Sequence, residues 1–159
     1  MPVPTREQRE KLLHAIIFFV TNTRNCRKTK LCKLLFFLDF GVFRQTGKSV
    51  TGLNYFAWPK GPVPKALFEE LKAPRVDLRA HLLVRELPRD DPDETALGFD
   101  IKPRKTFDDS KFTKRELSFM TTLAEIYRDA TADQMVEATH LKGQPWHRVY
   151  EREKPPVPA

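Results

Sequence analysis

The sequence has few of the features that mark secreted or membrane proteins. It holds two cysteines, Cys26 and Cys32, in 159 residues, whereas a secreted domain of this size more often carries several disulfide pairs. We therefore expect free thiols and a cytoplasmic protein. The longest apolar runs, AIIFFV and LLFFLDF, are far shorter than the roughly 20 residues that cross a bilayer. The first ten residues also lack the layout of a signal peptide, so we expect no membrane association.

The patterns that accompany metal binding or catalysis are also missing. The four histidines, at positions 14, 81, 140 and 147, lie at none of the short spacings that zinc ligands favour. There is no glycine-rich phosphate loop, no GxSxG elbow and no pair of catalytic carboxylates. We therefore expect no metal, no cofactor and no enzymatic activity. If a reaction centre exists, Asp39 and His140 are its candidates, although His140 fits better as a hydrogen-bonding residue in a turn between helices.

The composition favours one ordinary globular domain. Hydrophobic residues make up 40% of the chain and charged residues 31%, and no period of 20 to 50 residues indicates a repeat array. A chain of this length can bury a single core. We expect one domain over residues 1–152 and a flexible tail over residues 153–159.

Capping signals and apolar periodicity predict an α+β fold that is mainly α. Thr5 and Gln8 form a capping-box signature before apolar residues spaced three and four apart, which predicts a helix from residue 4 or 5 to 21. Thr29 is the expected cap of a second helix, 30–44, which is apolar on almost every side and should therefore be the buried central helix. Further helices are expected at 114–129, capped by Thr113 and Glu116, at about 131–139, and as a short last helix from Pro145.

Two segments predict a small antiparallel β element. Residues 81–87 (HLLVREL) and 96–102 (ALGFDIK) flank an acidic, proline-containing loop, as in a β-hairpin. The aromatic stretch Leu53–Trp58 is a candidate third strand for the same sheet. After it, Pro59, Gly61, Pro62 and Pro64 predict a rigid turn that leads into a helix at 64–72. This corner could serve the fold alone or a binding surface, and both interpretations remain open.

The net charge of +7 is concentrated near the N-terminus. Residues 1–60 hold 11 Lys and Arg against 3 Asp and Glu. The densest segment, RNCRKTKLCK, contains Arg24, Arg27, Lys28, Lys30 and Lys33. It is either a solvated loop and helix end or a contact surface for nucleic acid or an acidic protein. No helix-turn-helix, RNP-type or zinc-finger motif accompanies it.

Asp39 is a carboxylate inside the apolar central helix, between Leu38 and Phe40. Burial of an unpaired charge costs several kcal/mol. We therefore expect Asp39 to face a rim, a basic partner or a backbone donor, and to have a structural role.

Three segments together resemble the Panacea antitoxin domain, also known as the SocA-like or phage-associated GepA-like domain. They are KLLFFLDF (33–40), VTGLNYFAWPKGPVPKALFEEL (50–71) and ATHLKGQPWHRVY (138–150). Pro59 departs from the family pattern, as does the hairpin with its acidic loop. The residues that match the family motif, with Tyr55 between them, are Lys33, Leu34, Leu35, Asp39, Thr51, Gly52, Tyr55, Ala57, Trp58, Gly61, Pro62, Val63, Pro64, His140 and Trp146.

The resemblance implies the antitoxin of a bacterial or phage toxin-antitoxin system, which binds the toxin encoded by the adjacent gene and blocks it. One branch of the family acts as an adaptor that presents its toxin to a AAA+ protease, and this is the alternative function. The basic N-terminal third leaves nucleic-acid binding as a second alternative. We expect Trp58 to be a surface anchor for the toxin and Trp146 to lie in the core.

Overall fold

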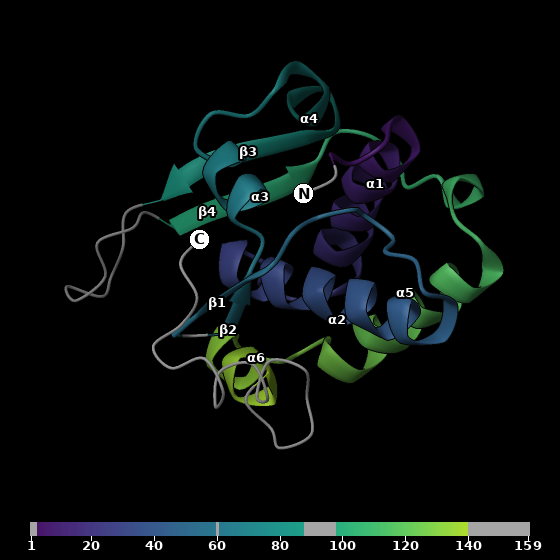
Figure 1. Cartoon of the computed structure of the whole chain (residues 1–159). Coiled ribbons are helices and arrows are strands. Elements are labelled where there is room, and N and C mark those ends of the chain that lie inside the picture. The colour runs from purple at the N-terminus through teal and green to yellow at the C-terminus, as the bar shows by residue number, and fades with distance from the viewer. Residues whose placement is uncertain (1–2, 60, 88–97, 140–159) are drawn as a thin grey trace.

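The computed structural model describes residues 3–59, 61–87 and 98–139. Over these ranges the chain forms six α-helices, one short 3-10 helix and two separate two-stranded antiparallel sheets (Figure 1). The predicted class, α+β and mainly α, is confirmed. None of the helices in these ranges has both the length and the hydropathy that a bilayer crossing requires.

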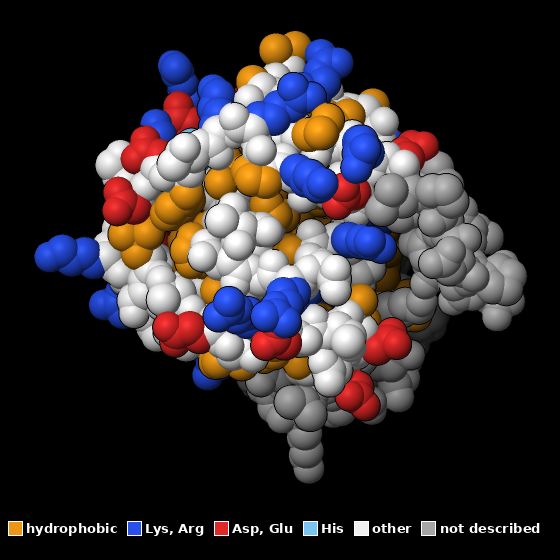
Figure 2. Space-filling model, turned by 180° about the vertical axis from the view of Figure 1, so that it is seen from behind, with side chains coloured by type: hydrophobic (Ala, Val, Ile, Leu, Met, Phe, Trp, Pro, Cys, Tyr) orange, Lys and Arg blue, Asp and Glu red, His pale blue; other side chains and the backbone are white. Residues whose placement is uncertain are grey.

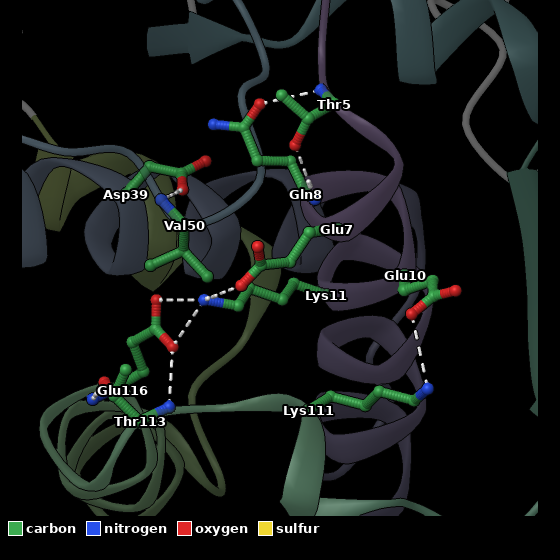
Figure 3. A network of polar contacts seen from close by, with 10 residues as sticks. All are labelled: Thr5, Glu7, Gln8, Glu10, Lys11, Asp39, Val50, Lys111, Thr113 and Glu116. Carbon is green, nitrogen blue, oxygen red and sulfur yellow. Dashed lines mark hydrogen bonds and ion pairs between the residues drawn. The ribbon is translucent and has the colours of Figure 1, made fainter.

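The two helices with capping boxes form as expected. Helix α1, Arg6–Asn22, follows Thr5, whose hydroxyl accepts a hydrogen bond from the Gln8 amide while the Gln8 side chain accepts one from the Thr5 amide (Figure 3). Helix α5, Lys114–Tyr127, begins in the same way at Thr113 and Glu116. Each reciprocal pair satisfies two amide donors that a helix start leaves open.

Helix α2, Lys28–Thr46, is the central helix that the sequence predicts. It contacts α1, α5 and the elements α6, β2 and β4 introduced below. Its start differs from the prediction, because the cap is Arg27 rather than Thr29 and no side chain makes the capping hydrogen bond. It ends at Thr46, two residues later than predicted, and the next residue, Gly47, has a φ of 75°, the left-handed conformation that glycine supplies at helix ends. The core lies between α2, α1, α5 and β4, and its largest fully buried apolar side chains are Phe19, Phe99, Leu13, Ile16, Ile17, Leu31, Leu34, Leu35, Leu38 and Leu67.

The β structure is only partly as expected. Strands β3, Leu82–Leu87, and β4, Gly98–Pro103, pair as the predicted hairpin. The expectation that Leu53–Trp58 joins this sheet is wrong. Strand β1, Phe56–Trp58, instead pairs with β2, Gly61–Val63, in a second sheet, so the predicted rigid turn is half of a hairpin. A strand that contains a proline lacks one ladder donor and fits only at an edge, which a two-stranded sheet provides.

The remaining elements are short. Helix α3, Lys65–Glu70, follows Pro64 and is shorter than the predicted 64–72. Helix α4, Val76–His81, and the 3-10 turn η1, Asp109–Lys111, were not predicted. Helix α6, Ala132–Thr139, agrees with the predicted 131–139. The predicted helix at Pro145 lies outside the described residues, as do His140 and Trp146.

Two ion-pair groups attach α1 to its neighbours. The Arg9 guanidinium donates two hydrogen bonds to Glu70 of α3, of 2.8 and 2.7 Å, and two of 2.9 Å to Asp77 of α4. Lys11 Nζ lies 2.9 Å from a carboxylate oxygen of Glu116 at the start of α5 (Figure 3). Because bidentate Arg–carboxylate pairs fix both position and orientation, Arg9 holds α3 and α4 in a defined place on α1.

Candidate functional site

Two family-motif residues of α2, Asp39 and Lys33, hydrogen-bond to the segment 49–64. We call these two contact points the framework. The first point is Asp39, which is buried. Its Oδ1 accepts hydrogen bonds of 2.9 Å from the amides of Val50 and Thr51 and one of 3.1 Å from the Ser49 hydroxyl. Its Oδ2 accepts from the Thr51 hydroxyl at 2.5 Å and from Tyr55 OH at 2.6 Å. Asp39 therefore finds backbone donors, one of the environments expected from the sequence.

The electrostatics of Asp39 fit a structural residue. Burial raises its pKa, while the donors from Thr51, Tyr55 and Ser49 act in the opposite direction. Burial beside this carboxylate also raises the pKa of Tyr55 well above its usual value. Five donors approach the two oxygens, which together offer about four lone-pair sites, so the carboxylate is fully engaged. The group is therefore engaged in holding the chain from Ser49 to Tyr55 on α2.

Gly52 brings this held segment against the start of α1. Its φ is 71°, a conformation that favours glycine. A Cβ at this position would lie 2.6 Å from Oε1 of Gln8, the side chain that completes the α1 capping box. Position 52 of the motif therefore requires a residue without a side chain, because the turn after Thr51 meets the start of α1 there.

The second point of the framework is Lys33. Its side chain is buried, and Nζ donates a 2.9 Å hydrogen bond to the carbonyl oxygen of Pro62 in β2. Burial lowers the pKa of Lys33 to about 8. Gly61, whose φ is 112°, lies next to the Lys33 amine. A Cβ at position 61 would be 3.0 Å from Lys33 Nζ and 2.7 Å from the Thr139 hydroxyl.

The hairpin that Lys33 holds presents Trp58 at the surface. Trp58 is partly exposed and packs edge-to-face on Phe68 of α3, with ring centroids 5.6 Å apart. Lys28 Nζ lies 3.6 Å from the centre of the same Phe68 ring, a cation–π arrangement. Ala57, Pro62 and Val63 of the hairpin are buried, as is Pro64 directly after it. Of the hairpin motif residues that the structure describes, Trp58 is therefore the one that offers a large apolar side chain to a partner.

The basic contact surface predicted for Arg24, Arg27, Lys28 and Lys30 is wrong for both lysines. Lys28 and Lys30 are buried, whereas Arg24 and Arg27 are exposed. Lys30 Nζ donates to three carbonyl oxygens, those of Arg24, Arg128 and Ala130, at 3.0, 3.1 and 2.8 Å. A lysine favours such carbonyls because the end of a helix carries partial negative charge.

On the face seen in Figure 2, Lys and Arg side chains are scattered among apolar ones, with no continuous basic stripe. A stripe would be expected of a surface that follows a nucleic-acid backbone. The exposed residues Arg24 and Arg27 do not make one by themselves.

An aromatic face that the sequence did not single out lies beside Asp39 on α2, and Tyr55 belongs to both. Phe36 contacts Phe40 and Tyr55, with ring centroids 4.4 and 5.4 Å apart. Phe40 and Tyr55 are partly exposed, and Phe43, one turn further along α2, is 52% exposed. The sequence signal was present in the spacing 36, 40 and 43, but it does not distinguish a buried stripe from an exposed one.

The chain was compared with protein-family models, curated proteins and solved structures. The family described as antitoxin SocA-like, Panacea domain, matches residues 31–147. The chain belongs to this family. No curated protein and no solved structure gave a significant match.

The matched range of the Panacea domain contains both points of the framework and the β1–β2 hairpin that Lys33 holds. It begins after Lys30, so most of the basic segment lies outside the family signature. Across the part of the chain that the structure describes, no three His, Cys, Asp or Glu side chains converge as a metal site. The family residues His140 and Trp146 fall in the matched range but beyond Thr139, the last described residue.

Proposed function

We propose that this protein is a non-enzymatic antitoxin that neutralises its cognate toxin by binding it directly. Membership of the SocA-like Panacea family indicates an antitoxin. The observation that carries the finer proposal is the internal use of the two charged motif residues of α2. The side chains of Asp39 and Lys33 form hydrogen bonds within the protein, and these bonds hold the chain between Ser49 and Pro62 on α2.

This arrangement favours binding over catalysis. Rigid elements lower the entropy that a protein loses when it binds a partner. The framework fixes a hairpin that presents Trp58, and aromatic residues on rigid supports are frequent anchors of protein interfaces. The proposed toxin-binding surface therefore includes Trp58, with Lys33, Asp39, Gly52 and Gly61 acting beneath it to keep its shape.

The test is a growth experiment in a bacterial host. The reading frame next to this gene is expressed alone, together with this protein, and together with the Asp39→Ala variant. We expect growth arrest in the first case, normal growth in the second and arrest in the third. The complex should then co-purify, and the toxin within it should be inactive. A toxin that keeps full activity in the purified complex would contradict neutralisation by binding.

The two alternatives give different results in the same experiment. An adaptor for a AAA+ protease would shorten the half-life of the toxin, and growth would be rescued only in cells with the protease. Nucleic-acid binding loses part of its motivation, because Lys28, Lys30 and Lys33 of the basic segment are buried.

A further inference from the structure

A band of aromatic rings crosses α2 outside the main core. The rings of Tyr55, Phe40, Phe36, Phe37 and Tyr127 follow one another, with centroids 6.2, 4.4, 5.9 and 5.4 Å apart. We call these five rings the aromatic band, which extends the aromatic face of α2 across to α5. Phe36, at its centre, is 2% exposed, and the other four rings are partly exposed. A contiguous apolar surface of this kind marks an interaction site.

The centre of the band belongs to a cluster that is separate from the main core. Phe36 and Ala57 are buried together in this cluster, and Phe37 borders both it and the main core. The Tyr55 hydroxyl donates a 2.6 Å hydrogen bond to Asp39 Oδ2 and is thus engaged inside the protein. The three phenylalanine side chains carry no polar atom. The band therefore fits an apolar ring, which can pack edge-to-face or offset-stacked on its members.

Helix α6 ends close to one edge of the band. A Cβ at Gly61 would lie 2.7 Å from the hydroxyl of Thr139, the last residue of α6, and 3.0 Å from Lys33 Nζ. Both α2 and β2 contact α6, which lies below them in Figure 1. On α2, the first phenylalanines of the band follow Lys33 by about one turn, and Phe40 follows it by about two. The chain after Thr139 therefore starts about one to two helical turns from the band.

The sequence after Thr139 contains an aromatic ring that can reach this site. Residues 140–147 lie outside the described part of the chain, and they include Trp146, seven positions after Thr139. Seven residues span up to roughly 25 Å when extended, whereas two turns of α2 measure about 11 Å. The Panacea match, residues 31–147, contains all five rings of the band and runs one residue beyond Trp146. The band and this tryptophan are thus within reach of each other and in the same family unit.

We propose that the aromatic band binds the indole of Trp146 from the same chain, which closes the outer side of α2.

The tether between α6 and Trp146 favours this occupant over a separate protein. A short tether gives the indole an effective concentration on the order of millimolar at the band, and another molecule would have to bind there more tightly to displace it. The inference does not rest on the proposed function, because it concerns how the domain packs on itself. In the proposed antitoxin the two tryptophans then have different roles, since Trp58 faces the toxin and Trp146 covers α2.

The test uses the full chain with Trp58→Phe, in which Trp146 is the remaining tryptophan. We expect its fluorescence emission at a shorter wavelength, and its quenching by acrylamide to be weaker, than in urea. Addition of Phe40→Ala should move the emission towards the value in urea and increase the quenching. Phe107→Ala is the matched control, because this ring is also partly buried but packs on Phe18 of α1. The control should leave the emission unchanged.

A double-mutant cycle distinguishes a contact from burial elsewhere in the protein. Urea unfolding gives the unfolding equilibrium constants of Phe40→Ala, Trp146→Ala and the double variant. Because the first change already removes part of the contact, the double variant should raise the constant at least about threefold less than the product of the two single effects. The pair Phe107→Ala and Trp146→Ala should agree with the product within about twofold. If Phe40→Ala does not fold, Phe40→Leu replaces it, and we expect the same direction.

Three outcomes would overturn the proposal. An emission that Phe40→Ala leaves unchanged, with additive effects in the cycle, would place Trp146 away from the band. A Phe40→Ala variant of unchanged stability that binds the purified toxin at least about tenfold more weakly would make the toxin the occupant. A wild-type dimer that Phe40→Ala separates into monomers would mean that a second copy of this chain covers the band.

Discussion

Lys33 Nζ donates a 2.9 Å hydrogen bond to the carbonyl oxygen of Pro62, and this contact fastens the β1–β2 hairpin to the buried side of α2. The donor is a lysine at 2% exposure, on the same helix as a carboxylate that holds the preceding segment. Two charges of opposite sign on one helix thus secure two ends of the same stretch of chain.

The Lys33 amine should make stability rise at alkaline pH. Its pKa is lowered from 10.5 to about 8 in the folded chain, so between these pH values the unfolded chain binds more protons. The free energy of unfolding should therefore increase by up to roughly 3 kcal/mol across this range, relative to Lys33→Met. Urea unfolding of both proteins at a series of pH values measures the difference. Parallel pH profiles for the two proteins would contradict the lowered pKa.

Replacement of Asp39 by Asn should destabilise the protein by about 2–4 kcal/mol. The NH2 group of the asparagine is a hydrogen-bond donor, and it would face groups that donate to Asp39. Thr51 and Tyr55 both donate to Oδ2, so either orientation of the amide leaves at least one of the five donors unmatched. Tyr55→Phe removes a single donor and should cost only about 1 kcal/mol. Chemical denaturation gives both values, and equal losses in the two variants would argue against the central position of Asp39.

Gly61→Ala should cost more stability than Gly47→Ala, although φ is positive at both. A Cβ at Gly47 meets nothing within 4 Å, whereas one at Gly61 would lie 2.7 Å from the Thr139 hydroxyl and 3.0 Å from Lys33 Nζ. We expect about 1 kcal/mol for Gly47→Ala and roughly 2–3 for Gly61→Ala. The bulkier Gly61→Val should in addition weaken toxin neutralisation, which the growth assay measures. Similar losses for the two alanine variants would mean that backbone conformation alone sets the cost.

His14 should make the protein less stable under mildly acidic conditions. Its Nδ1 accepts a hydrogen bond from the Asp108 amide, and its ring lies edge-on to that of His81, 5.3 Å between centroids. Burial and the neighbouring His81 lower the pKa of His14, so the unfolded chain binds more protons just below pH 6.5. Stability should fall as the pH decreases from about 6.5 towards the folded pKa. His14→Gln should show a shallower decrease in the same unfolding titration, and an unchanged slope would contradict this role.

Trp58→Ala should weaken neutralisation more than its effect on stability explains. Trp58 packs on Phe68 at the surface, so truncation loses part of a half-exposed contact and should cost about 1 kcal/mol or slightly more. Phe68→Ala removes the same contact from the other side, together with the contact between Lys28 Nζ and the Phe68 ring, and serves as the control. We expect Phe68→Ala to lower the thermal midpoint at least as much as Trp58→Ala, but only Trp58→Ala to lose toxin affinity, by about tenfold or more. Equal toxin affinities of Trp58→Ala and Phe68→Ala would mean that Trp58 is not the anchor.

The parts of the fold that depend on local signals were predictable from the sequence. The capping boxes at Thr5 and Thr113 placed the starts of α1 and α5, because they connect residues three positions apart. The all-round apolar pattern identified α2 as central for a similar reason, since it reports on one helix alone. In the candidate site, the same pattern marked Asp39 as a group that needs a rim, a basic partner or a backbone donor, and the structure supplies backbone donors.

The parts that depend on distant partners were not predictable. Lys30 is buried because carbonyl oxygens 98 and 100 residues away accept its hydrogen bonds, and a lysine that snorkels to water has the same local sequence. The clamp from Arg9 to Glu70 joins residues 61 positions apart. Strand β2 opposes local propensity, since glycine and proline are depleted in strands, and it forms because Lys33 and β1 hold it.

Helix α1 lies wholly before residue 31, where the Panacea match begins, yet the framework packs against it. Gln8 lies next to the turn at Gly52, and Arg9 hydrogen-bonds to Glu70 of α3 and Asp77 of α4. A fragment limited to residues 31–147 would therefore lack α1 and the core side chains that α1 contributes. The range that the family match covers is therefore shorter than the range whose side chains build the core.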